Sequence, residues 1–453
     1  MDTPAPQRAD SAPSSHLSLS EALRFWLKLG FISFGGPAGQ IALMHAELVD
    51  RRRWISEKRF LHALNYCMLL PGPEAQQLAT YLGWLLHRTW GGILAGTLFV
   101  LPSLFIIMAL AWLYMAHGDV PAVAGVFHGI KPAVTALVAQ AAWRVGSRSL
   151  KNAWHWGIAS AAFVAIFALD LPFPAIVLGA AAIGFVGGRL HPSAFGGGGG
   201  HGQTGPRAPG LRALIDDDTP PPAHARFSWR RFATVFVASV GLWLVAMGAL
   251  VAAYGLDSAL VQMGWFFTKA ALMTFGGAYA VLPYVYQGAV EHFHWLTATQ
   301  MIDGLALGET TPGPLIMVVS FVAFVGAWTH AIFGPDSLLL AGAAAATVVT
   351  FFTFLPSFFF ILLGGPFIES THGNLKFTAP LAAITAAVVG VIVNLAVFFA
   401  YHVVWPKGFG GAADGWSIAI GVAAAVALMR YKVGVIPVIV AAGVAGLAVQ
   451  LLR

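Results

Sequence analysis

The chain has 453 residues, of which 58% are hydrophobic and only 10% are charged. Soluble domains carry about 25% charged residues, so this composition excludes a soluble globular protein and predicts an all-α polytopic membrane protein. The formal charge of +6 is modest and its basic residues fall in loops, which favours membrane orientation over nucleic-acid binding. The single cysteine excludes an internal disulfide and argues against a metal cluster.

The predicted elements begin after a polar, proline-rich stretch, residues 1–20, which is expected to form a disordered tail. Many of the apolar segments that follow exceed the ~18–20 residues that cross a bilayer. These segments are 22–46, 60–86, 91–116, 121–143, 154–170, 172–188, 232–254, 260–287, 300–328, 337–364, 378–402, 416–429 and 433–452. The Gly- and Pro-rich composition of 189–231 predicts a flexible, solvated cytoplasmic linker between two halves of the chain.

The two halves repeat each other. "KLGFISFGGP" at 28–37 matches "KAALMTFGGA" at 269–278, an offset of 269 − 28 = 241. The same offset pairs the Pro-Gly-Pro at 71–73 with that at 312–314. "FVLPS" at 99–103 matches "TFLPS" at 353–357 with an offset of 254, so an insertion is expected in the second half between these motifs. We therefore assign a first repeat to 21–188 and a second to 256–453.

Loop charge predicts that the repeats have opposite orientations. Loop 45–60 contains five Lys and Arg residues, whereas its partner at 286–301 contains none. Because basic loops stay in the cytoplasm, the two loops are expected on opposite faces, and the extra span at 232–255 inverts the second copy. This is the inverted-topology repeat of many secondary transporters. About nine full spans plus four re-entrant hairpins satisfy the loop charges, and thirteen full spans are the alternative.

Two kinds of helix break, Phe-Gly-Gly and Pro-Gly-Pro, recur in each half. Proline removes a backbone donor and pushes the preceding residue out of helical geometry, while glycine allows positive φ. Pro73 and Pro314 are expected to start new half-helices, which leaves the amides of Glu74–Gln76 and Leu315–Met317 without helical partners. Such helix N-termini bind anions, so four breaks near the midplane would build a polar cavity. The predicted cradle is Gly35, Gly36, Pro71, Gly72, Pro73, Gly276, Gly277, Pro312, Gly313 and Pro314.

Lys28 and Lys269 are repeat-equivalent and precede the Gly-Gly breaks by one to two turns. One interpretation is a pair of charges that face a bound anion, and the other is that the lysines reach the lipid headgroups. Lys269 lies deeper in its apolar segment, where an unpaired charge costs roughly 3 kcal/mol or more, which favours the anion ligand. Other side chains could donate to an oxyanion or satisfy buried backbone groups instead: Gln40, Asn65, Gln76, Gln77, Thr80, Thr310 and Thr311.

Glu74 and Glu309 flank the two Pro-Gly-Pro turns and are candidates for proton coupling. Glu74 could instead complement a helix dipole. Glu309 ends a half-helix, where the dipole disfavours a carboxylate, so we expect a salt bridge to Lys269 or a proton-carrying role. Asp303 is expected near the membrane interface. The sequence contains no nucleotide-binding, hydrolase or metal-ligand motif, so it predicts no enzyme, no metal and no cofactor.

Four motifs occur together in this chain. They are "FGGPAGQIALMHAELVDRRRWISEKRF" and "LLPGPEAQQLATYLGW" in the first half, and "TFGGAYAVLPYV" and "LALGETTPGPLIMVVSFVAF" in the second. In this combination the sequence resembles the chromate ion transporter family in its long, two-domain form. The resemblance implies a multi-pass protein of the bacterial inner membrane that exports chromate, uses the proton motive force and confers chromate resistance.

The residues themselves leave alternatives open. Chromate and sulfate differ little in shape, and a backbone cradle separates such ions weakly, so transport of sulfate or another tetrahedral oxyanion is the first alternative. An anion channel with the same cavity is the second, and a chromate-reducing enzyme, for which no redox motif is present, is the third. The expected partners are the oxyanion, protons and the lipid bilayer, without nucleic acid. The oligomeric state is open, and a homodimer is compatible with the sequence.

Overall fold

The structure, a computed structural model of the chain, describes residues 17–34, 36–118, 120–195, 213–216, 219, 222–275, 277–371 and 378–452. Within these ranges the secondary structure is helical, apart from one isolated β-bridge between Ile55 and Ile215. The all-α prediction is therefore confirmed. Residues 1–16 of the predicted tail, Gly35, Gly276 and about half of the predicted linker (196–212, 217–218 and 220–221) lie outside the described residues.

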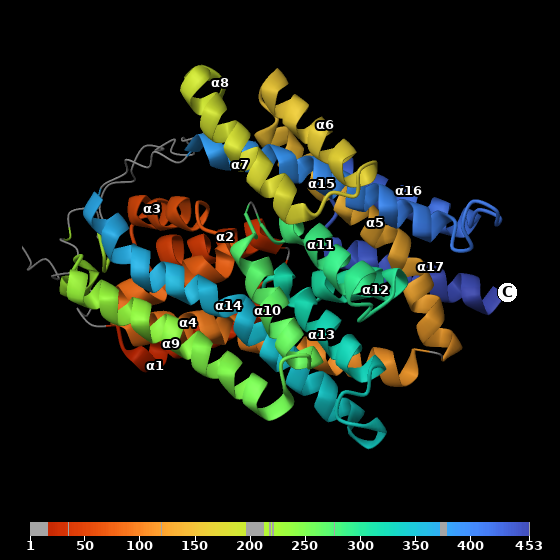
Figure 1. Cartoon of the computed structure of the whole chain (residues 1–453), viewed down its shortest axis with the longest axis horizontal. Helices are drawn as coiled ribbons and strands as arrows, with labels where there is room; N and C mark the ends of the chain where they lie inside the picture. The colour runs from red at the N-terminus through yellow and green to blue at the C-terminus, as the bar shows by residue number, and fades with distance from the viewer. Residues whose placement is uncertain are drawn as a thin grey trace, which may run out of the picture.

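The first half opens with short helices and continues with long ones. Its first helix begins where the Ser18 side chain accepts a hydrogen bond from the amide of Glu21, which is the usual role of an N-cap serine. The elements are α1 (Leu19–Ile32), α2 (Gly36–His45), the π-helical η1 (Ala46–Arg51), α3 (Glu57–Cys67), α4 (Glu74–His117), α5 (Pro121–Ser149), α6 (Ala153–Phe167), α7 (Phe173–Leu190) and α8 (Pro192–Phe195) (Figure 1).

The second half follows α9 (Trp229–Tyr254), and the short 3₁₀ turn η2 (Ala223–Ala225) precedes that helix. Its elements are α10 (Ala259–Leu272), α11 (Ala278–Tyr286), the π-helical η3 (Gln287–His292), α12 (Ala298–Thr310), the 3₁₀ turn η4 (Leu315–Met317), α13 (Val318–Thr329), the 3₁₀ turn η5 (Pro335–Ser337), α14 (Leu338–Thr371), α15 (Thr378–Val404), α16 (Gly415–Met429) and α17 (Val435–Leu452).

Seven helices within the described residues are long and apolar enough to cross a membrane. They are α4, α5, α7, α9, α14 (with η5), α15 and α17. The sequence assigned full spans to α6 and α16 as well, but each has 15 residues and so extends about 22 Å, short of the ~30 Å hydrocarbon core. The four segments with predicted breaks are each divided at the break. The chain is thus a multi-pass membrane protein.

The two repeats fold alike at the offset found in the sequence. Ser56 caps α3 and Thr297 caps α12, and 56 + 241 = 297. A π-helical turn precedes each cap, at Ala46–Arg51 and Gln287–His292. Further along, α6 and α16 have 15 residues each, and α7 and α17 have 18 residues each. The loop between α13 and α14 lies where the sequence predicts an insertion in the second half.

The first-half equivalent of α13 and α14 is the single element α4, which contains a sharp turn. Its backbone is non-helical at residues 87–88. The two arms of α4, residues 74–87 and 88–117, fold back on each other at glycines, since a Cβ on Gly83 would lie only 2.5 Å from the carbonyl oxygen of Gly91. The arms therefore pack antiparallel as a helical hairpin.

Equivalent helices of the two repeats run in opposite directions. The first arm of α4 runs parallel to α14, because Gly72 just before that arm faces Ser357, whereas Trp84 near its end faces Gly365. The second arm of α4 is antiparallel to the first and hence antiparallel to α14, its equivalent at the offset of 254. This is the geometry expected of an inverted-topology repeat.

A second group of helices packs beside the helices that carry the breaks, along the top and right of Figure 1, and we call it the second bundle: α5, α6, α7, α15, α16 and α17. In it α5 packs against α16 and α17, while α15 packs against α6 and α7. Each half thus contributes one long helix that packs against two helices of the other half, as expected for two copies related by a two-fold axis. Glycines make the contact of α5 with α17, because a Cβ on Gly129 would lie 1.9 Å from the carbonyl oxygen of Ala442. Small residues allow such close backbone approach between helices in membranes.

We expect Gly129→Ala to destabilise this second bundle, because α17 must move to make room for the added methyl group. Overpacking of this kind costs about 1–3 kcal/mol, so the apparent melting temperature of the purified protein in detergent should fall by a few degrees. Gly157→Ala in α6 is the matched control, since nothing lies within 4 Å of a Cβ there. An equal melting temperature for the two variants would contradict the contact.

The described part of the linker packs against the first half. Ile215 is 7% exposed, and its backbone bonds to the Ser56 amide and the Trp54 carbonyl at 3.0 Å each. His224 donates a ring N–H to the carbonyl oxygen of Trp84 at 2.9 Å, and burial lowers the pKa of His224, which favours the neutral ring. At these positions the expected flexible, solvated linker is ordered instead, because an apolar side chain such as Ile215 gains a buried site.

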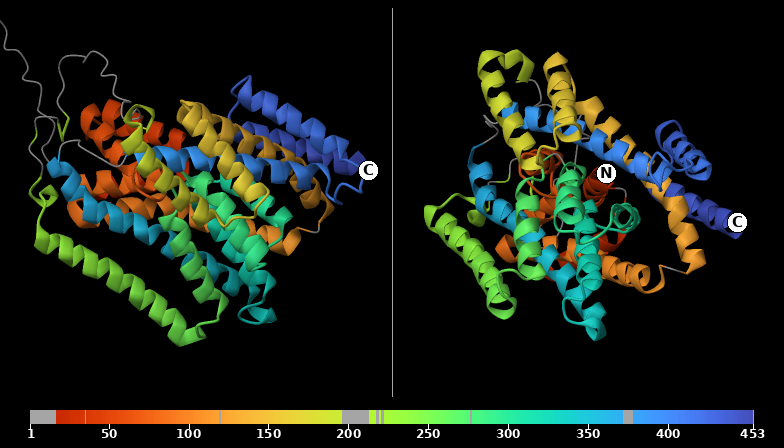
Figure 2. Two further views of the ribbon diagram at one scale, coloured as in Figure 1. Left: turned by 45° about the horizontal axis from the view of Figure 1, so that its top comes forward. Right: turned by 45° about the vertical axis from the view of Figure 1, so that its right-hand side comes forward.

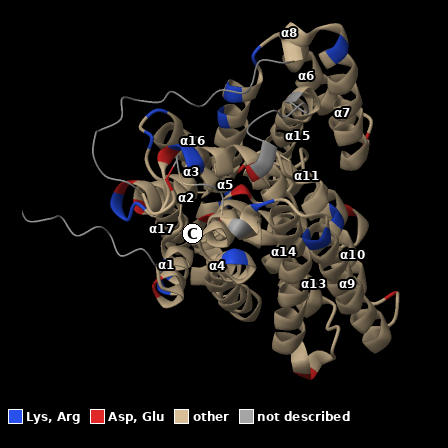
Figure 3. Cartoon of the chain, turned by 90° about the vertical axis from the view of Figure 1, so that its left-hand side faces the viewer, with Lys and Arg blue, Asp and Glu red and all other residues tan. Residues whose placement is uncertain are grey.

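The helix α9 lies along the outside of the molecule (Figure 2). Only 6% of the residues in its apolar stretch are buried within the protein, so much of the helix is available to lipid. Its position between the two halves fits the extra span that the sequence requires. Charged residues colour only short stretches of the ribbon in Figure 3, as expected for a chain that is mostly embedded in the membrane.

Candidate functional site

The helix breaks of the two repeats meet through reciprocal hydrogen bonds. The amide of Gly72 donates to the carbonyl of Thr274 at 2.7 Å, and the amide of Gly313 donates to the carbonyl of Ser33 at 2.8 Å. Both pairs of equivalent residues are related by the offset of 241. Such an exchange of equivalent contacts is typical of surfaces related by a two-fold axis. We call the site formed by Ser33, Gly72, Thr274 and Gly313, together with the side chains that contact them, the crossing.

Only glycine fits at the two Pro-Gly-Pro turns. The backbone φ is 126° at Gly72 and 101° at Gly313, a region that L side chains rarely adopt. Space is also short. A Cβ on Gly72 would lie 2.6 Å from Ser357 Oγ, and one on Gly313 would lie 2.7 Å from Ser103 Cβ. Each turn is therefore pressed against a serine of the other repeat's long helix.

New helices begin directly after the turns. Pro73 and Pro314 are the N-caps, and the helical residues begin one position later than predicted, at Glu74 and Leu315. The Met317 amide was expected to be free, which is wrong, since it donates to the Pro314 carbonyl at 2.9 Å in a 3₁₀ turn. The amides without helical partners are those of the first residues of each new helix, and they give each turn a local positive potential.

The Phe-Gly-Gly breaks have the predicted effect on the chain. Gly36 begins α2 with φ 70°, and Gly277 caps α11 with φ 99°. No atom lies within 4 Å of a Cβ at either position, in contrast to the crowded Pro-Gly-Pro glycines. The Gly-Gly breaks therefore need the backbone freedom of glycine rather than its small size.

Four hydroxyl groups on the helices that form the crossing are buried without a hydrogen-bond partner in the described part of the chain. They belong to Ser33, Ser103, Thr353 and Ser357, and all four residues are 0% exposed. Helical Ser and Thr often donate to the carbonyl one turn earlier, as Thr80 does here. Buried polar groups are nearly always hydrogen-bonded. These hydroxyls are therefore suited to donate hydrogen bonds to a ligand.

The donors predicted from the sequence are mostly bonded to the chain itself. Gln40 Nε2 donates to the carbonyl of Gly313 at 2.5 Å, and Gln77 Nε2 donates to that of Pro71 at 2.7 Å. The other predicted donors near the turns bond to backbone carbonyls or to one another: Gln76, Thr80, Thr310 and Thr311. Asn65 is exposed. Most of these donors therefore satisfy backbone carbonyls, and Gln76 bonds to the Thr80 hydroxyl instead.

The structure does not bring Lys28 and Lys269 to the crossing. Both residues are exposed, on α1 and α10. Lys269 Nζ lies 5.7 Å from the centre of the Trp265 ring, and Trp265 is itself 52% exposed. A cation beside an exposed aromatic ring is typical of side chains that reach the lipid interface. The salt bridge considered between Lys269 and Glu309 is not formed, because Glu309 is buried.

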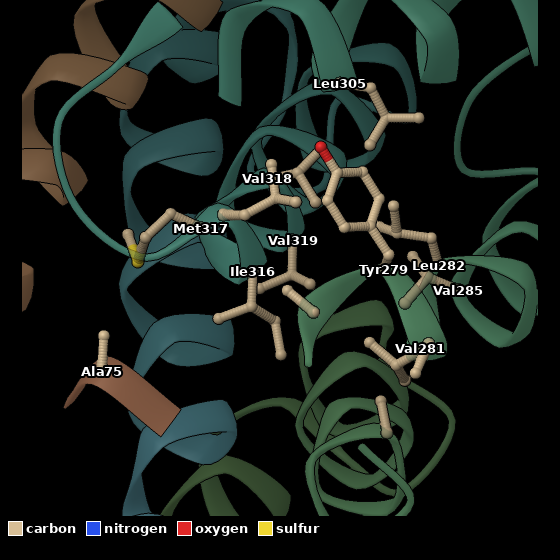
Figure 4. Packing of buried hydrophobic residues seen from close by; sticks show 14 of the residues in the cluster. Ala75, Tyr279, Val281, Leu282, Val285, Leu305, Ile316, Met317, Val318 and Val319 are labelled. Carbon is tan, nitrogen blue, oxygen red and sulfur yellow. The ribbon is translucent and has the colours of Figure 1, made fainter. Parts of the chain in front are cut away.

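Glu309 is a buried carboxylate three residues before the second Pro-Gly-Pro turn. It is 8% exposed, accepts a hydrogen bond from the Tyr279 hydroxyl and interacts electrostatically with Arg144 of α5. The Tyr279 ring extends from α11 among apolar side chains of α12 and α13 (Figure 4). Glu74 is half-buried at the start of α4, and within the described ranges it has no hydrogen-bond or ion-pair partner.

Asp303 differs from the expectation of an interfacial position. It is 2% exposed, lies 3.5 Å from Lys131 Nζ and accepts a hydrogen bond of 2.9 Å from the Tyr114 hydroxyl. A buried carboxylate is stable only when it is paired and hydrogen-bonded, and Lys131 and Tyr114 supply both interactions. The helix α12 thus contains two buried acids, Asp303 and Glu309.

Comparison with known proteins settles the family. A family model described as chromate transporter matches residues 20–185 and 261–447, which include most of both repeats. The chain belongs to the chromate transporter family. A chromate transport protein of Pseudomonas aeruginosa is 33% identical over 437 residues, which cover 95% of this chain and 92% of that protein. A chromate transport protein of Cupriavidus metallidurans is 28% identical over 413 residues, which cover 88% of each chain. No solved structure matches this family member.

The sequence motifs of this chromate transporter family member did not predict Arg144 or the four buried hydroxyls of Ser33, Ser103, Thr353 and Ser357. A signal for Ser103 and Ser357 was present, because each ends a Leu-Pro-Ser motif that aligns the repeats. A polar residue repeated at the same point of two apolar segments is a candidate site residue, beyond its use for alignment. No comparable signal exists for Arg144, which the sequence groups with the basic residues of a loop.

Proposed function

We propose that this member of the chromate transporter family exports chromate across the bacterial inner membrane through the crossing, driven by the proton gradient. The observation that carries the proposal is the group of buried, unbonded hydroxyls beside the two Pro-Gly-Pro turns. Chromate is a tetrahedral dianion whose oxygens accept hydrogen bonds from several directions. Hydroxyl donors and helix N-termini bind such an ion.

Neutral donors also suit a transporter for a kinetic reason. A site must bind its ion strongly enough to admit it and weakly enough to release it on the other side. A buried lysine would hold a dianion strongly in a medium of low dielectric, and would be left unpaired after release. Hydroxyl groups carry no charge, so the empty crossing is not penalised by an uncompensated charge.

We expect Ser103→Ala and Ser357→Ala each to slow chromate transport by about tenfold or more, because a hydrogen bond to a charged group contributes about 1.5–3 kcal/mol. The measurement is the initial rate of labelled-chromate accumulation in inside-out membrane vesicles with an imposed proton gradient. In such vesicles an exporter pumps inward. Thr347→Ala is the matched control, since that hydroxyl is exposed and bonded to the Ala343 carbonyl.

The same vesicles test the exposed lysine. Lys269→Ala should accumulate chromate at the wild-type rate, because the Lys269 side chain lies beside Trp265 and away from the crossing. Wild-type rates in both serine variants, or loss of accumulation in Lys269→Ala, would contradict the hydroxyl site. If the wild-type protein accumulated no chromate, the proposal that it exports chromate would be contradicted.

Sulfate is the competing substrate that the same hydroxyls favour, since it is also a tetrahedral dianion. Discrimination between the two ions by hydrogen-bond donors alone is weak. Strong inhibition of chromate uptake by sulfate at low ratios would identify a sulfate carrier with chromate as a passenger. Chromate flux that neither saturates nor stalls when the proton gradient is collapsed would identify an anion channel.

A further inference from the structure

A buried cluster ties α3 to the long helix of the other repeat. Arg59 on α3 donates to Glu369, near the end of α14, with 2.7 Å between Nη1 and Oε2. The other oxygen of that carboxylate accepts a hydrogen bond of 2.5 Å from the Tyr81 hydroxyl. The side chains of Arg59 and Glu369 are 13% and 4% exposed, so the pair is nearly enclosed. We call these three residues the Arg59 latch.

A second buried cluster ties α12 to the first repeat. Asp303 on α12 accepts a hydrogen bond from Tyr114, near the end of the second arm of α4, and pairs with Lys131 of α5 at 3.5 Å. The Asp303 side chain is 2% exposed. We call these three residues the Asp303 latch.

The latches occupy nearly equivalent positions in the two repeats. Since 303 − 241 = 62, Asp303 corresponds to a site one turn from Arg59, and since 369 − 254 = 115, Glu369 corresponds to the neighbour of Tyr114. Both clusters lie near the carboxyl ends of their long helices. Because those helices run antiparallel, the two latches lie at opposite ends of the molecule. Arg59 is itself one of the five basic residues of loop 45–60, which is expected in the cytoplasm.

Each latch holds the helix that leads into one Pro-Gly-Pro turn. The helix α3 ends at Cys67, four residues before the turn at 71–73, and α12 ends at Thr310, two residues before the turn at 312–314. Release of a latch would free that helix to tilt and expose the crossing to one face. A buried ion pair adds little net stability, so such pairs can break and re-form during a transport cycle.

We propose that the two latches are alternate gates: the Arg59 latch closes the crossing toward the cytoplasm, and the Asp303 latch closes it toward the opposite face. The inference rests on the proposed transport through the crossing. Arg59, Glu369 and Asp303 are then positioning residues that do not touch the anion. Both latches are formed in the structure, which in this scheme corresponds to both gates being closed.

Cys67 reports the state of the first gate. It is the single cysteine of the sequence, is 0% exposed and lies at the end of α3. Glu369→Gln should raise the rate of its alkylation by a membrane-impermeant maleimide about tenfold or more in inside-out vesicles and leave it unchanged in right-side-out vesicles. The matched control is Glu57→Gln on the same helix, α3. This change removes an exposed partner of His45 of α2 and should change neither rate.

The second gate needs a reporter at the equivalent position, 67 + 241 = 308. In a Cys67→Ser chain, Gly308→Cys is tolerated because a Cβ there meets no atom closer than 3.4 Å. Asp303→Asn should raise labelling of that cysteine in right-side-out vesicles alone.

A rescue experiment tests the first gate. The charge-reversed pair Arg59→Glu with Glu369→Arg should restore slow labelling of Cys67, which a merely loosened fold would not do.

Equal increases from both faces, no increase, or no rescue by the charge-reversed pair would overturn the gates. The labelling needs no chromate, so its result is separate from that of the flux assay. One-sided labelling in a protein that does not move chromate would support the gates and contradict chromate as the substrate. Chromate flux with unchanged labelling in the variants would support chromate as the substrate and contradict the gates.

Discussion

Gly72→Ala and Gly313→Ala should each abolish chromate transport while the protein still reaches the membrane. An alanine at φ 126° or 101° is strained by about 1–3 kcal/mol. The added Cβ would also lie 2.6 Å from Ser357 Oγ or 2.7 Å from Ser103 Cβ, so the two helices must separate at the crossing. That shift would displace the serine hydroxyls and weaken the reciprocal bonds to Thr274 and Ser33. Accumulation in inside-out vesicles, normalised to the amount of protein, measures the effect.

Gly255→Ala separates crowding from backbone strain. Gly255 ends α9 with φ 83°, yet no atom lies within 4 Å of a Cβ there. The alanine is therefore strained in a similar way but meets no neighbour, and we expect transport near the wild-type rate. Equal loss in all three variants would mean that strain alone explains the result, and transport by Gly313→Ala at the wild-type rate would remove its turn from the pathway.

The helix breaks could be predicted because their causes are local. Proline and glycine change the backbone wherever they occur, and the turns at 71–73 and 312–314 divide their segments as expected. The repeat could also be predicted, since the offset of 241 relates Ser56 to Thr297 as N-caps as well as the two Pro-Gly-Pro motifs. The direction of the second repeat followed from loop charge, and the antiparallel packing of α14 against the second arm of α4 agrees with it.

The side chains at the crossing could not be predicted in the same way. Depth in an apolar segment does not give the face of the helix that a residue occupies, which is why Lys269 was expected inside and lies outside. That face is set by packing of α10 against α14 and α9. Asp303 shows the complementary case, because the partner that keeps it buried, Lys131, is 172 positions away in sequence. No local pattern joins two such residues.

Glu309→Gln should separate chromate movement from the proton gradient. A glutamine oxygen can still accept the hydrogen bond from Tyr279, and the side chain has nearly the same size, so the local structure is kept. What is lost is the group that can take up and release a proton. Accumulation driven by the gradient should fall about tenfold or more, whereas exchange of labelled for unlabelled chromate at equal concentrations should stay within about twofold.

Glu74→Gln is the decisive comparison, because Glu74 is the other carboxylate beside a Pro-Gly-Pro turn. Glu309 accepts a hydrogen bond from Tyr279, so a change in its protonation would alter a direct contact between α12 and α11. Glu74 has no such partner within the described residues. If only Glu74→Gln lost gradient-driven accumulation while exchange persisted, the proton carrier would lie on α4. Loss of exchange in Glu309→Gln would make Glu309 part of the anion path rather than of the proton path.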